Sequence, residues 1–337
     1  MITVKLFNSL DENELAALSA RLVAGWPGAS PYHYLEYARV IDEHFQYPNL
    51  SLAAFDQYQR PVGWLPQWRH GCLIESVPWR DRGGPLFDDP EVLNLLLNET
   101  KALATEHGCR GLNWKDFSAP GLTAYEAGLS MTADLTVGPP EVLWRRVEGK
   151  NIIRQAEKNG LIFRRSASPA EDLPAFYEMF EETRRRLGVP AYSPAFFQTL
   201  FRCLADRQAA LFFAVRGEAR LAGLICLMTP EKMIYAFGAS NEEGRTQRAN
   251  NFVLWQAQLQ AKNWGLGTFD FGTDSLLQTG LLKFKEKLGG CPRKVFNAHW
   301  GRVKEMDHNR PLYAPVKMVM SHLPRPLFRW ASRQLVK

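Results

Sequence analysis

An acidic side chain between two phenylalanines is the first candidate for chemistry. Asp270 lies in Thr268–Phe271, a predicted strand that is followed by Gly272. Strand alternation places Asp270 on the face opposite to Phe269 and Phe271. A carboxylate is costly in a core unless it is paired. Asp270 could accept a proton from an attacking amine, or it could make a structural hydrogen bond to the following loop, and the sequence leaves both alternatives open.

Basic residues with helical spacing form a second candidate. Lys150, Arg154 and Lys158 recur every four residues, so they share one face of a helix that we predict over 142–159. An anionic substrate could bind across that face. A solvated amphipathic helix would show the same pattern.

An anion site is predicted where the strand Lys232–Ala239 leads through a loop into the helix Ala249–Asn263. The N-terminus of a helix offers unpaired backbone N–H groups to a phosphate, and arginine can contact phosphate oxygens directly. An ordinary solvated loop is the alternative. The residues that we expect to line this anion site are Phe237, Gly238, Arg245, Arg248 and Asn250.

The first half of the chain contains the stretch PWRDRGGP at Pro78–Pro85. Its two glycines allow a close approach of the backbone, while Trp79 and Arg80 supply stacking and charge. We interpret Trp79 and Arg80 as part of an acceptor groove. The alternative is a plain loop between strands.

Composition limits the class of protein. The 337 residues suggest about two domains, and the 46% hydrophobic residues with a net charge of +6 are ordinary for a globular protein. The five scattered cysteines predict reduced thiols, and the seven histidines show no metal-binding spacing, so no metal is expected. Walker and G-x-S-x-G motifs are absent. Without a signal-peptide pattern or a long apolar run, the chain is expected to be cytoplasmic.

The sequence repeats itself weakly. Ala54 and Gly63 match Ala214 and Gly223 at an offset of 160 residues, inside two predicted hairpins. These matches, with others before and after them, predict two copies of one α/β unit. The predicted domains are 1–137, 138–305 and a C-terminal tail, 306–337.

Several stretches of the second copy together resemble the GNAT superfamily of acyltransferases, and in particular its Fem family, which adds amino acids to peptidoglycan precursors and includes relatives associated with exosortase systems. The stretches are NIIRQAEKNG (151–160), TRRRLGVP (183–190), RANNFVLW (248–255), FDFG (269–272) and GLLKFKEKLG (280–289). The resemblance implies an α/β (α+β) fold built as a tandem duplication of the GNAT-like unit, with a degenerate first copy and a C-terminal helical tail.

The resemblance also implies roles for residues. Lys285 matches the lysine of the Fem motif and would stabilise an oxyanion, with Asp270 or a substrate group taking the proton. Arg186 and Tyr192 would line an acceptor pocket, together with Arg154 and Lys158. The GNAT phosphate loop has glycine where this chain has Arg248. This departure from the family pattern argues against simple acetyl-CoA binding.

The resemblance implies an acyl or aminoacyl transferase that acts on an amine of a small or lipid-linked envelope or polysaccharide precursor. The expected donor is acyl-CoA or aminoacyl-tRNA, with no permanently bound cofactor, and the acceptor is expected in a groove between the copies. The alternative is a non-catalytic GNAT-like module that binds an envelope intermediate or a partner.

The tail is basic and apolar, with Arg325, Arg329, Arg333 and Lys337 spaced by four residues. This pattern is typical of a helix that lies on anionic lipid, and it predicts contact with the inner face of a membrane. A C-terminal helix docked on the protein is the alternative.

Overall fold

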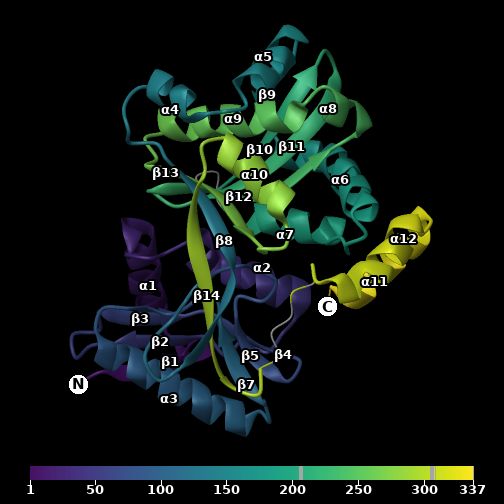
Figure 1. Ribbon diagram of the computed structural model, residues 1–337. Helices are drawn as coiled ribbons and strands as arrows, with labels where there is room; N and C mark the ends of the chain where they lie inside the picture. Colours follow the sequence, from purple (N-terminus) through teal and green to yellow (C-terminus); the bar gives the residue numbers. More distant parts are fainter. Residues whose placement is uncertain (205–207, 304–306, 308, 337) are drawn as a thin grey trace. The chain divides into compact units, whose positions relative to one another are not determined.

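The computed structural model describes residues 1–204, 208–303, 307 and 309–336. The chain divides into two compact units (Figure 1), of which unit 1 comprises Met1–Gly128 and Lys294–Met306, and unit 2 comprises Leu129–Arg293 and Asp307–Lys337. Both units mix helices with a sheet, which confirms the predicted α/β class. The domain limits 1–137, 138–305 and 306–337 stay a prediction.

Unit 1 contains two sheets. Strands β1, β2, β3 and β6 form one sheet in that order, and β4, β5, β7 and β14 are successive neighbours in the other. Helix α3 buries an apolar stripe against the strands, because Val92, Leu96 and Leu103 recur at helical spacing. The elements are β1 (Thr3–Leu6), α1 (Glu12–Gly25), α2 (Leu35–Phe45), β2 (Leu52–Phe55), β3 (Pro61–Leu65), β4 (Gln67–His70), β5 (Leu73–Ser76), β6 (Leu86–Phe87), α3 (Pro90–Glu106), β7 (Gly111–Trp114), part of β8 (Thr123–Asp134) and part of β14 (Cys291–Gly301).

Unit 2 is built on one sheet with the order β8-β13-β12-β11-β10-β9. Helix α9 packs on it through buried Phe252, Val253 and Ala257, and α6 packs on β11 and β12. The elements are α4 (Pro140–Arg146), α5 (Lys150–Lys158), β9 (Ile162–Arg165), α6 (Pro169–Arg186), α7 (Pro194–Cys203), β10 (Ala209–Arg216), β11 (Ala219–Met228), β12 (Lys232–Ser240), α8 (Glu242–Thr246), α9 (Ala249–Asn263), β13 (Thr268–Asp274), α10 (Thr279–Lys287), α11 (Ala314–His322) and α12 (Arg325–Leu335). The sequence pattern also predicts a helix over 194–205, which α7 matches, and its last residue lies outside the described residues.

The two hairpins share a shift in strand register at equivalent positions, which supports the duplication. The pairing of β2 with β3 shifts register directly after Ala54, and that of β10 with β11 shifts directly after Ala214, which is 160 residues further along. The glycines of the repeat lie in β3 and β11 as predicted, but one residue out of register: Gly63 pairs with Ala54, whereas Gly223 pairs with Phe213. A one-residue slip exchanges the faces of a strand.

The faces of the two glycines differ accordingly. A Cβ at Gly63 would meet Val92 of α3, and a Cβ at Gly223 would meet Phe176 of α6. The two α/β units and the register shift that their hairpins share confirm the tandem arrangement. The two glycines, however, are not equivalent in their packing.

The prediction of one continuous helix over 142–159 is wrong. The stretch 142–159 forms two helices, α4 and α5, rather than one. The backbone N–H groups of Glu148 and Gly149 donate to the carbonyl of Lys287, at 2.9 and 3.2 Å, so this segment leaves the helix to satisfy a distant acceptor. Arg154 and Lys158 still share α5.

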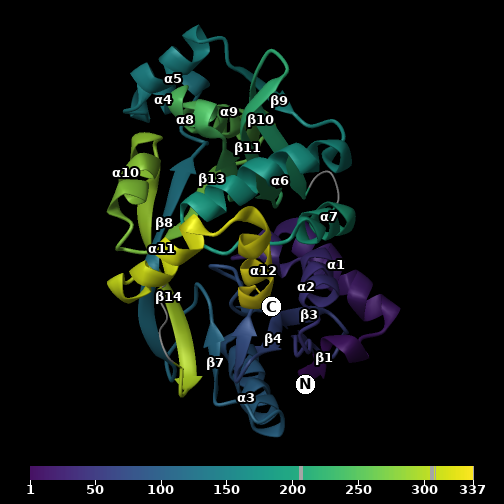
Figure 2. The same cartoon turned by 90° about the vertical axis from the view of Figure 1, so that its right-hand side faces the viewer.

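Figure 2 shows α11 and α12 as two consecutive short helices at the C-terminal end, so the predicted helical tail is confirmed. Within the described part of the chain, no helix has the length and apolarity needed to cross a bilayer.

Candidate functional site

Two adjacent parallel strands diverge in unit 2. The register of β12 and β13 covers three residue pairs, from Lys232↔Thr268 to Ile234↔Asp270. Beyond that point β12 continues to Ser240 along β11, and β13 continues along β8. The opening leaves Tyr235, Gly238 and Gly272 partly accessible. Edge groups of diverging strands can pair with an extended ligand that contains amides.

Asp270 fixes the shape of β13 at this opening. Its Oδ1 accepts a hydrogen bond from the N–H of Gly272, at 2.8 Å, and one from the hydroxyl of Ser130, at 3.4 Å. Gly272 has a φ of +80° and lies in a register shift between β13 and β8, a conformation that favours glycine. These hydrogen bonds fit the structural alternative for Asp270, because its buried carboxylate holds the bulge.

Lys285 is buried beside this bulge. Its side chain is 4% exposed, and its Nζ lies 2.5 Å from Oδ2 of Asp274, whose side chain is 9% exposed. Lys283 and Lys287 on the same helix are exposed. The burial of Lys285 thus distinguishes it from a basic residue on a solvated helix face, which is the other explanation for three lysines on one short helix. Asp274 was missed as a functional residue, although its place at the end of the FDFGTD strand was a usable signal.

Tyr235 completes the group. The Nζ of Lys285 lies 6.0 Å from the centre of the Tyr235 ring. Burial, and then the negative charge of Asp274, raise the pKa of the Tyr235 hydroxyl, which stays protonated at neutral pH. A Cβ at Gly238 would lie 2.1 Å from Oη of Tyr235, so only glycine permits this position of the phenol. The sequence analysis did not single out Tyr235.

The predicted phosphate loop keeps an unusual backbone. Arg248 precedes α9 with φ +60° and ψ +29°, in the left-handed region. A non-glycine residue adopts this left-handed conformation at a cost of about 1–2 kcal/mol. The side chain of Arg248, the N-cap residue, makes no capping hydrogen bond to α9. Backbone N–H groups at such an end are suited to a phosphate.

Asn250 and Arg245, the other two residues predicted for this loop, both contact Ser240. The amide of Asn250 donates to the hydroxyl of Ser240 at 3.0 Å, and Arg245 lies 3.4 Å from the Ser240 carbonyl oxygen. Arg245 also pairs with Glu182 at 3.6 Å. Burial, and then the adjacent charge of Arg245, lower the pKa of Arg186. The structure thus brings together Arg186 and Arg245, to which the sequence analysis gave different ligands.

Phe237 requires a correction. Its side chain is packed among aromatic rings, 5.7 Å from Tyr192 and 5.1 Å from Phe197 between ring centres. Strand alternation sends it to the face covered by α6 and α7. Its side chain therefore belongs to the core and does not line the expected cavity with Arg248 and Lys285. Tyr192 stacks on Phe196 at the edge of the same cluster, and is partly exposed.

The basic helix α5 lies at the surface. Arg154 and Lys158 are exposed, and the guanidinium of Arg154 lies 5.5 Å from the ring centre of Trp144. Asn159, directly after the helix, donates to Gln247 of the phosphate loop at 2.5 Å. The exposed basic face is thereby fixed to the segment that holds Arg248.

Unit 1 holds the other predicted acceptor residues in a polar network. Trp79 donates from Nε1 to the hydroxyl of Tyr47 at 3.0 Å, and Arg80 lies over the ring of Tyr32, 5.8 Å from its centre. Trp79 has φ +65°, a strained conformation for a bulky residue. The positive φ and the network distinguish this stretch from a plain loop.

The network also contains a buried ion pair. Burial alone would raise the pKa of Glu75, but Lys115, His70 and Asn113 lower it to about 2. His70 Nδ1 lies 2.8 Å and Lys115 Nζ 3.8 Å from Oε2 of Glu75. Burial lowers the pKa of Lys115, with Glu75 opposing this effect.

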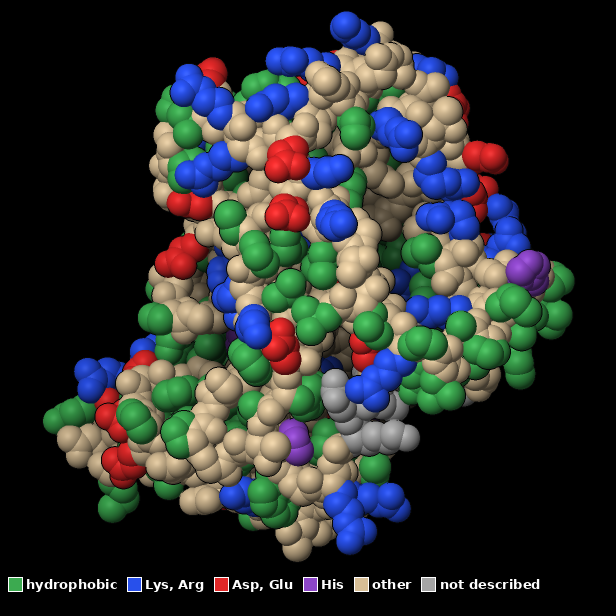
Figure 3. All heavy atoms as spheres, viewed as in Figure 1, with side chains coloured by type: hydrophobic (Ala, Val, Ile, Leu, Met, Phe, Trp, Pro, Cys, Tyr) green, Lys and Arg blue, Asp and Glu red, His purple; other side chains and the backbone are tan. Residues whose placement is uncertain are grey.

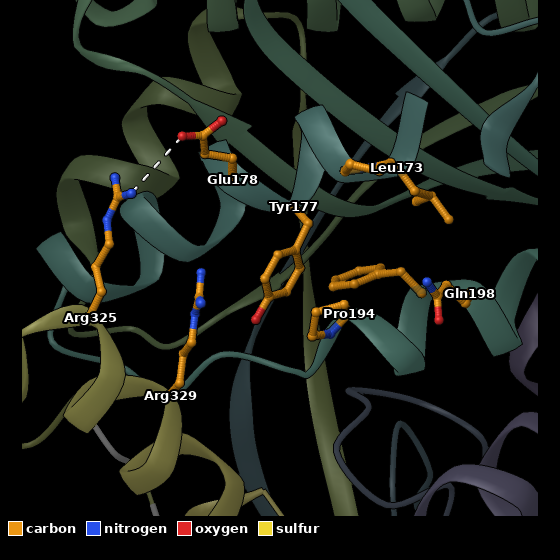
Figure 4. Close-up of a pocket in the computed structure, with 9 residues that line it drawn as sticks. Leu173, Tyr177, Glu178, Pro194, Gln198, Arg325 and Arg329 are labelled. Carbon is orange, nitrogen blue, oxygen red and sulfur yellow. Dashed lines mark ion pairs between the residues drawn. The ribbon is translucent and has the colours of Figure 1, made fainter. Parts of the chain in front are cut away.

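A cavity of about 280 Å³ lies elsewhere in unit 2, beside α6, α7 and α12. Its walls are mostly apolar, and Arg325 and Arg329 extend from α12 toward α6, with Arg325 4.0 Å from Glu178 (Figure 4). None of the predicted site residues lines this cavity. Among the residues that the structure describes, no group of three or more His, Cys, Asp or Glu could hold a metal ion.

Comparisons with known proteins concern the sequence family of one part of the chain and the fold. Residues 145–286 match the sequence model of the acetyltransferase (GNAT) domain, a range that includes β12, β13, Asp274 and Lys285. A search of curated proteins found no match.

Three solved structures are similar in fold. FemX is 16% identical, with 94% of this chain and 100% of that chain covered and a TM-score of 0.68. The C-terminal domain of an Agrobacterium fabrum protein described as a lysylphosphatidylglycerol synthetase is 12% identical, with 91% and 95% covered and a TM-score of 0.57. A tandem GNAT protein from the clavulanic acid biosynthesis pathway is 14% identical, with 90% and 100% covered and a TM-score of 0.52.

Proposed function

We propose that this chain, which contains a GNAT acetyltransferase domain over residues 145–286, transfers an acyl group from a thioester donor to an amine. The observation that carries the proposal is the buried pair of Lys285 and Asp274 where β12 and β13 diverge. The donor would lie along the open edge of β12, with its phosphates at the N-terminus of α9. Arg245, Arg248 and Asn250 would surround those phosphates.

The groups at the opening supply what acyl transfer needs. As the amine attacks, a C–N bond forms and the carbonyl oxygen becomes negative, and the Lys285 ammonium stabilises that charge. The Asp274 carboxylate accepts the proton from the attacking nitrogen. The C–S bond then breaks, and the leaving thiolate takes that proton from the Asp274 carboxyl, which restores the carboxylate. The Tyr235 hydroxyl, which its raised pKa keeps protonated, donates a hydrogen bond to the leaving sulfur. Asp270 positions Gly272 and Asp274 by holding the bulge.

The acceptor that we propose is an anionic envelope or polysaccharide precursor that carries an amine. Exposed Arg154 and Lys158, together with Arg186, offer positive charge in unit 2, and Trp79 and Arg80 offer stacking and charge in unit 1. The fold shared with FemX and with a lysylphosphatidylglycerol synthetase supports such a class of acceptor. An aminoacyl-tRNA is the alternative donor.

A non-catalytic module is the second candidate function. Arg248 favours it, because a long side chain replaces the glycine that lets phosphate approach the backbone. In that case a donor or an envelope intermediate would bind without turnover.

Donor binding and turnover separate these alternatives. Thermal unfolding is measured with a panel of acyl-CoA thioesters, with coenzyme A alone and with an aminoacyl-tRNA. At 100 times its dissociation constant a ligand stabilises the folded state by about 2.7 kcal/mol. Thioesters should stabilise the protein and be consumed when an amine acceptor is added. If thioesters stabilise the protein but are not consumed, the result supports the non-catalytic binding module. If only the aminoacyl-tRNA stabilises the protein, the donor is aminoacyl-tRNA rather than a thioester.

A further inference from the structure

The positive charge of the chain is concentrated at its C-terminal end. Residues 308–337 contain six of the 41 Lys and Arg and none of the 35 Asp and Glu. The rest of the chain therefore carries 35 of each and has no net formal charge. The segment that holds the excess is the one that forms α11 and α12.

One side of α12 packs on unit 2. Phe328 and Ser332, one helical turn apart, are buried, and the hydroxyl of Ser332 accepts a hydrogen bond from the N–H of Ala191 at 3.1 Å. Arg329 pairs with the buried carboxylate of Glu181, with Nη2 and Oε2 2.9 Å apart. These contacts confirm the docked helix, the alternative that the sequence analysis left open for the tail.

Helix α11 is fixed on the same unit by a close backbone contact. A Cβ at Gly188, which has φ +65°, would lie 2.0 Å from the carbonyl oxygen of Lys317. The last turn of α6 and the loop after it can therefore approach α11 only because residue 188 is glycine. Arg185 donates to the carbonyl of Leu323 between α11 and α12 at 3.4 Å.

The other side of the two helices exposes large apolar side chains. Trp330 is 64% exposed and Met318 is 65% exposed. Figure 3 shows hydrophobic side chains gathered over α11 and α12, with Lys and Arg side chains beside them. A contiguous exposed apolar surface marks an interaction site, whereas single exposed apolar residues do not. The apolar residues of this surface, here called the tail face, are Leu312, Val316, Met318, Val319, Leu327, Trp330 and Leu335.

We propose that the tail face binds the surface of a lipid bilayer that contains anionic lipids. Apolar side chains that include tryptophan would enter the interface between headgroups and acyl chains. The surrounding cations, with no acidic residue between 308 and 337, match the negative potential of anionic headgroups. The docking of α12 on unit 2 leaves Arg333 exposed for this contact. The inference is independent of acyl transfer.

The test uses the full chain with sedimenting lipid vesicles at about 0.15 M salt. One set contains phosphatidylcholine alone, and the other contains phosphatidylcholine with phosphatidylglycerol. The protein should bind the anionic vesicles at least tenfold more tightly, and binding should weaken as salt rises. Arg333→Gln should weaken anionic binding about fivefold, which corresponds to about 1 kcal/mol for one charge near the surface.

Trp330→Ser and Leu327→Ser test the apolar part. Both side chains are exposed, so these variants should unfold like the wild type while losing vesicle binding about tenfold or more. Val23→Ser in α1, where Val23 is 48% exposed, is the matched control and should bind as the wild type does. Unchanged binding of the Trp330 variant, or no preference for anionic vesicles, overturns the proposal. So does a dimer that Trp330→Ser dissociates in the absence of any vesicle binding, since the occupant is then a second copy.

Discussion

Replacing Lys285 by methionine should lower the free energy of unfolding, in addition to any effect on catalysis. The ammonium and the Asp274 carboxylate are 2.5 Å apart and both are buried, so Lys285→Met leaves Asp274 without its cation in a poorly solvated place. Breaking a buried ion pair by removing one partner costs about 3–5 kcal/mol. In a unit of this size, a loss of about 3 kcal/mol lowers Tm by about 6–12 °C.

The double variant Lys285→Met/Asp274→Asn removes both charges and should recover most of this loss. Neutral replacement of a buried pair is often close to neutral in stability. We expect the double variant to lie within about 1 kcal/mol of the wild type, with a coupling of at least about 2 kcal/mol in the double-mutant cycle. Denaturant unfolding of the wild type, the two single variants and the double variant measures it.

Lys283→Met and Lys287→Met are the matched controls, because both lysines are exposed on the same helix. They should change the free energy of unfolding by less than about 0.5 kcal/mol. A Lys285→Met protein as stable as these controls, or a cycle with no coupling, would refute a buried pair at this position.

Three further predictions concern the surroundings of the site and unit 1. Gly238→Ala places a Cβ 2.1 Å from Oη of Tyr235, so it should cost about 1–3 kcal/mol in unfolding free energy, and a stability equal to the wild type would contradict that contact. The free energy of unfolding of Arg248→Gly should exceed that of Arg248→Ala by about 1 kcal/mol, because alanine keeps the strain of the positive φ and glycine removes it. Equal denaturation midpoints of the two variants would count against the strain. The pKa of Glu75 is held at about 2, below the ordinary 4.5, so its contribution of about 3 kcal/mol is present above pH 4.5 and is lost as pH falls toward 2. Glu75→Gln should flatten that part of the pH dependence of unfolding, and an unchanged slope would show that other carboxylates cause it.

Local signals in the sequence predict most elements of unit 2. The helix Ala249–Asn263 has the predicted bounds. The hairpin strands of the second copy, which the pattern places at 210–215 and 221–228, agree with β10 and β11 within a residue or two. The break between α4 and α5 was not predictable, because it depends on the Lys287 carbonyl more than 130 residues away. The one-residue slip between Gly63 and Gly223 was likewise hidden, since sequence offsets do not report strand register.

The site was predicted in part. Lys285 was selected by its motif, and its burial agrees with a special role. Its partner Asp274 and the phenol of Tyr235 were missed, because an ion pair and a bulge in β12 arise only when three separate segments pack together. Phe237 was misassigned because a strand residue next to a loop can face either side, and here the aromatic side chains of α6 and α7 cover it.

The rate of acyl transfer by the Lys285→Met/Asp274→Asn variant tests the central claim most directly. The donor is the thioester that stabilises the wild type best, and the readout is kcat with an amine acceptor, beside donor binding measured from thermal unfolding. The account predicts a folded variant that binds the donor within about threefold of the wild type and loses at least about 10²–10³ in kcat, because the oxyanion stabilisation by Lys285 and the proton acceptance by Asp274 are both removed. A folded variant that transfers the acyl group at the wild-type rate would contradict it.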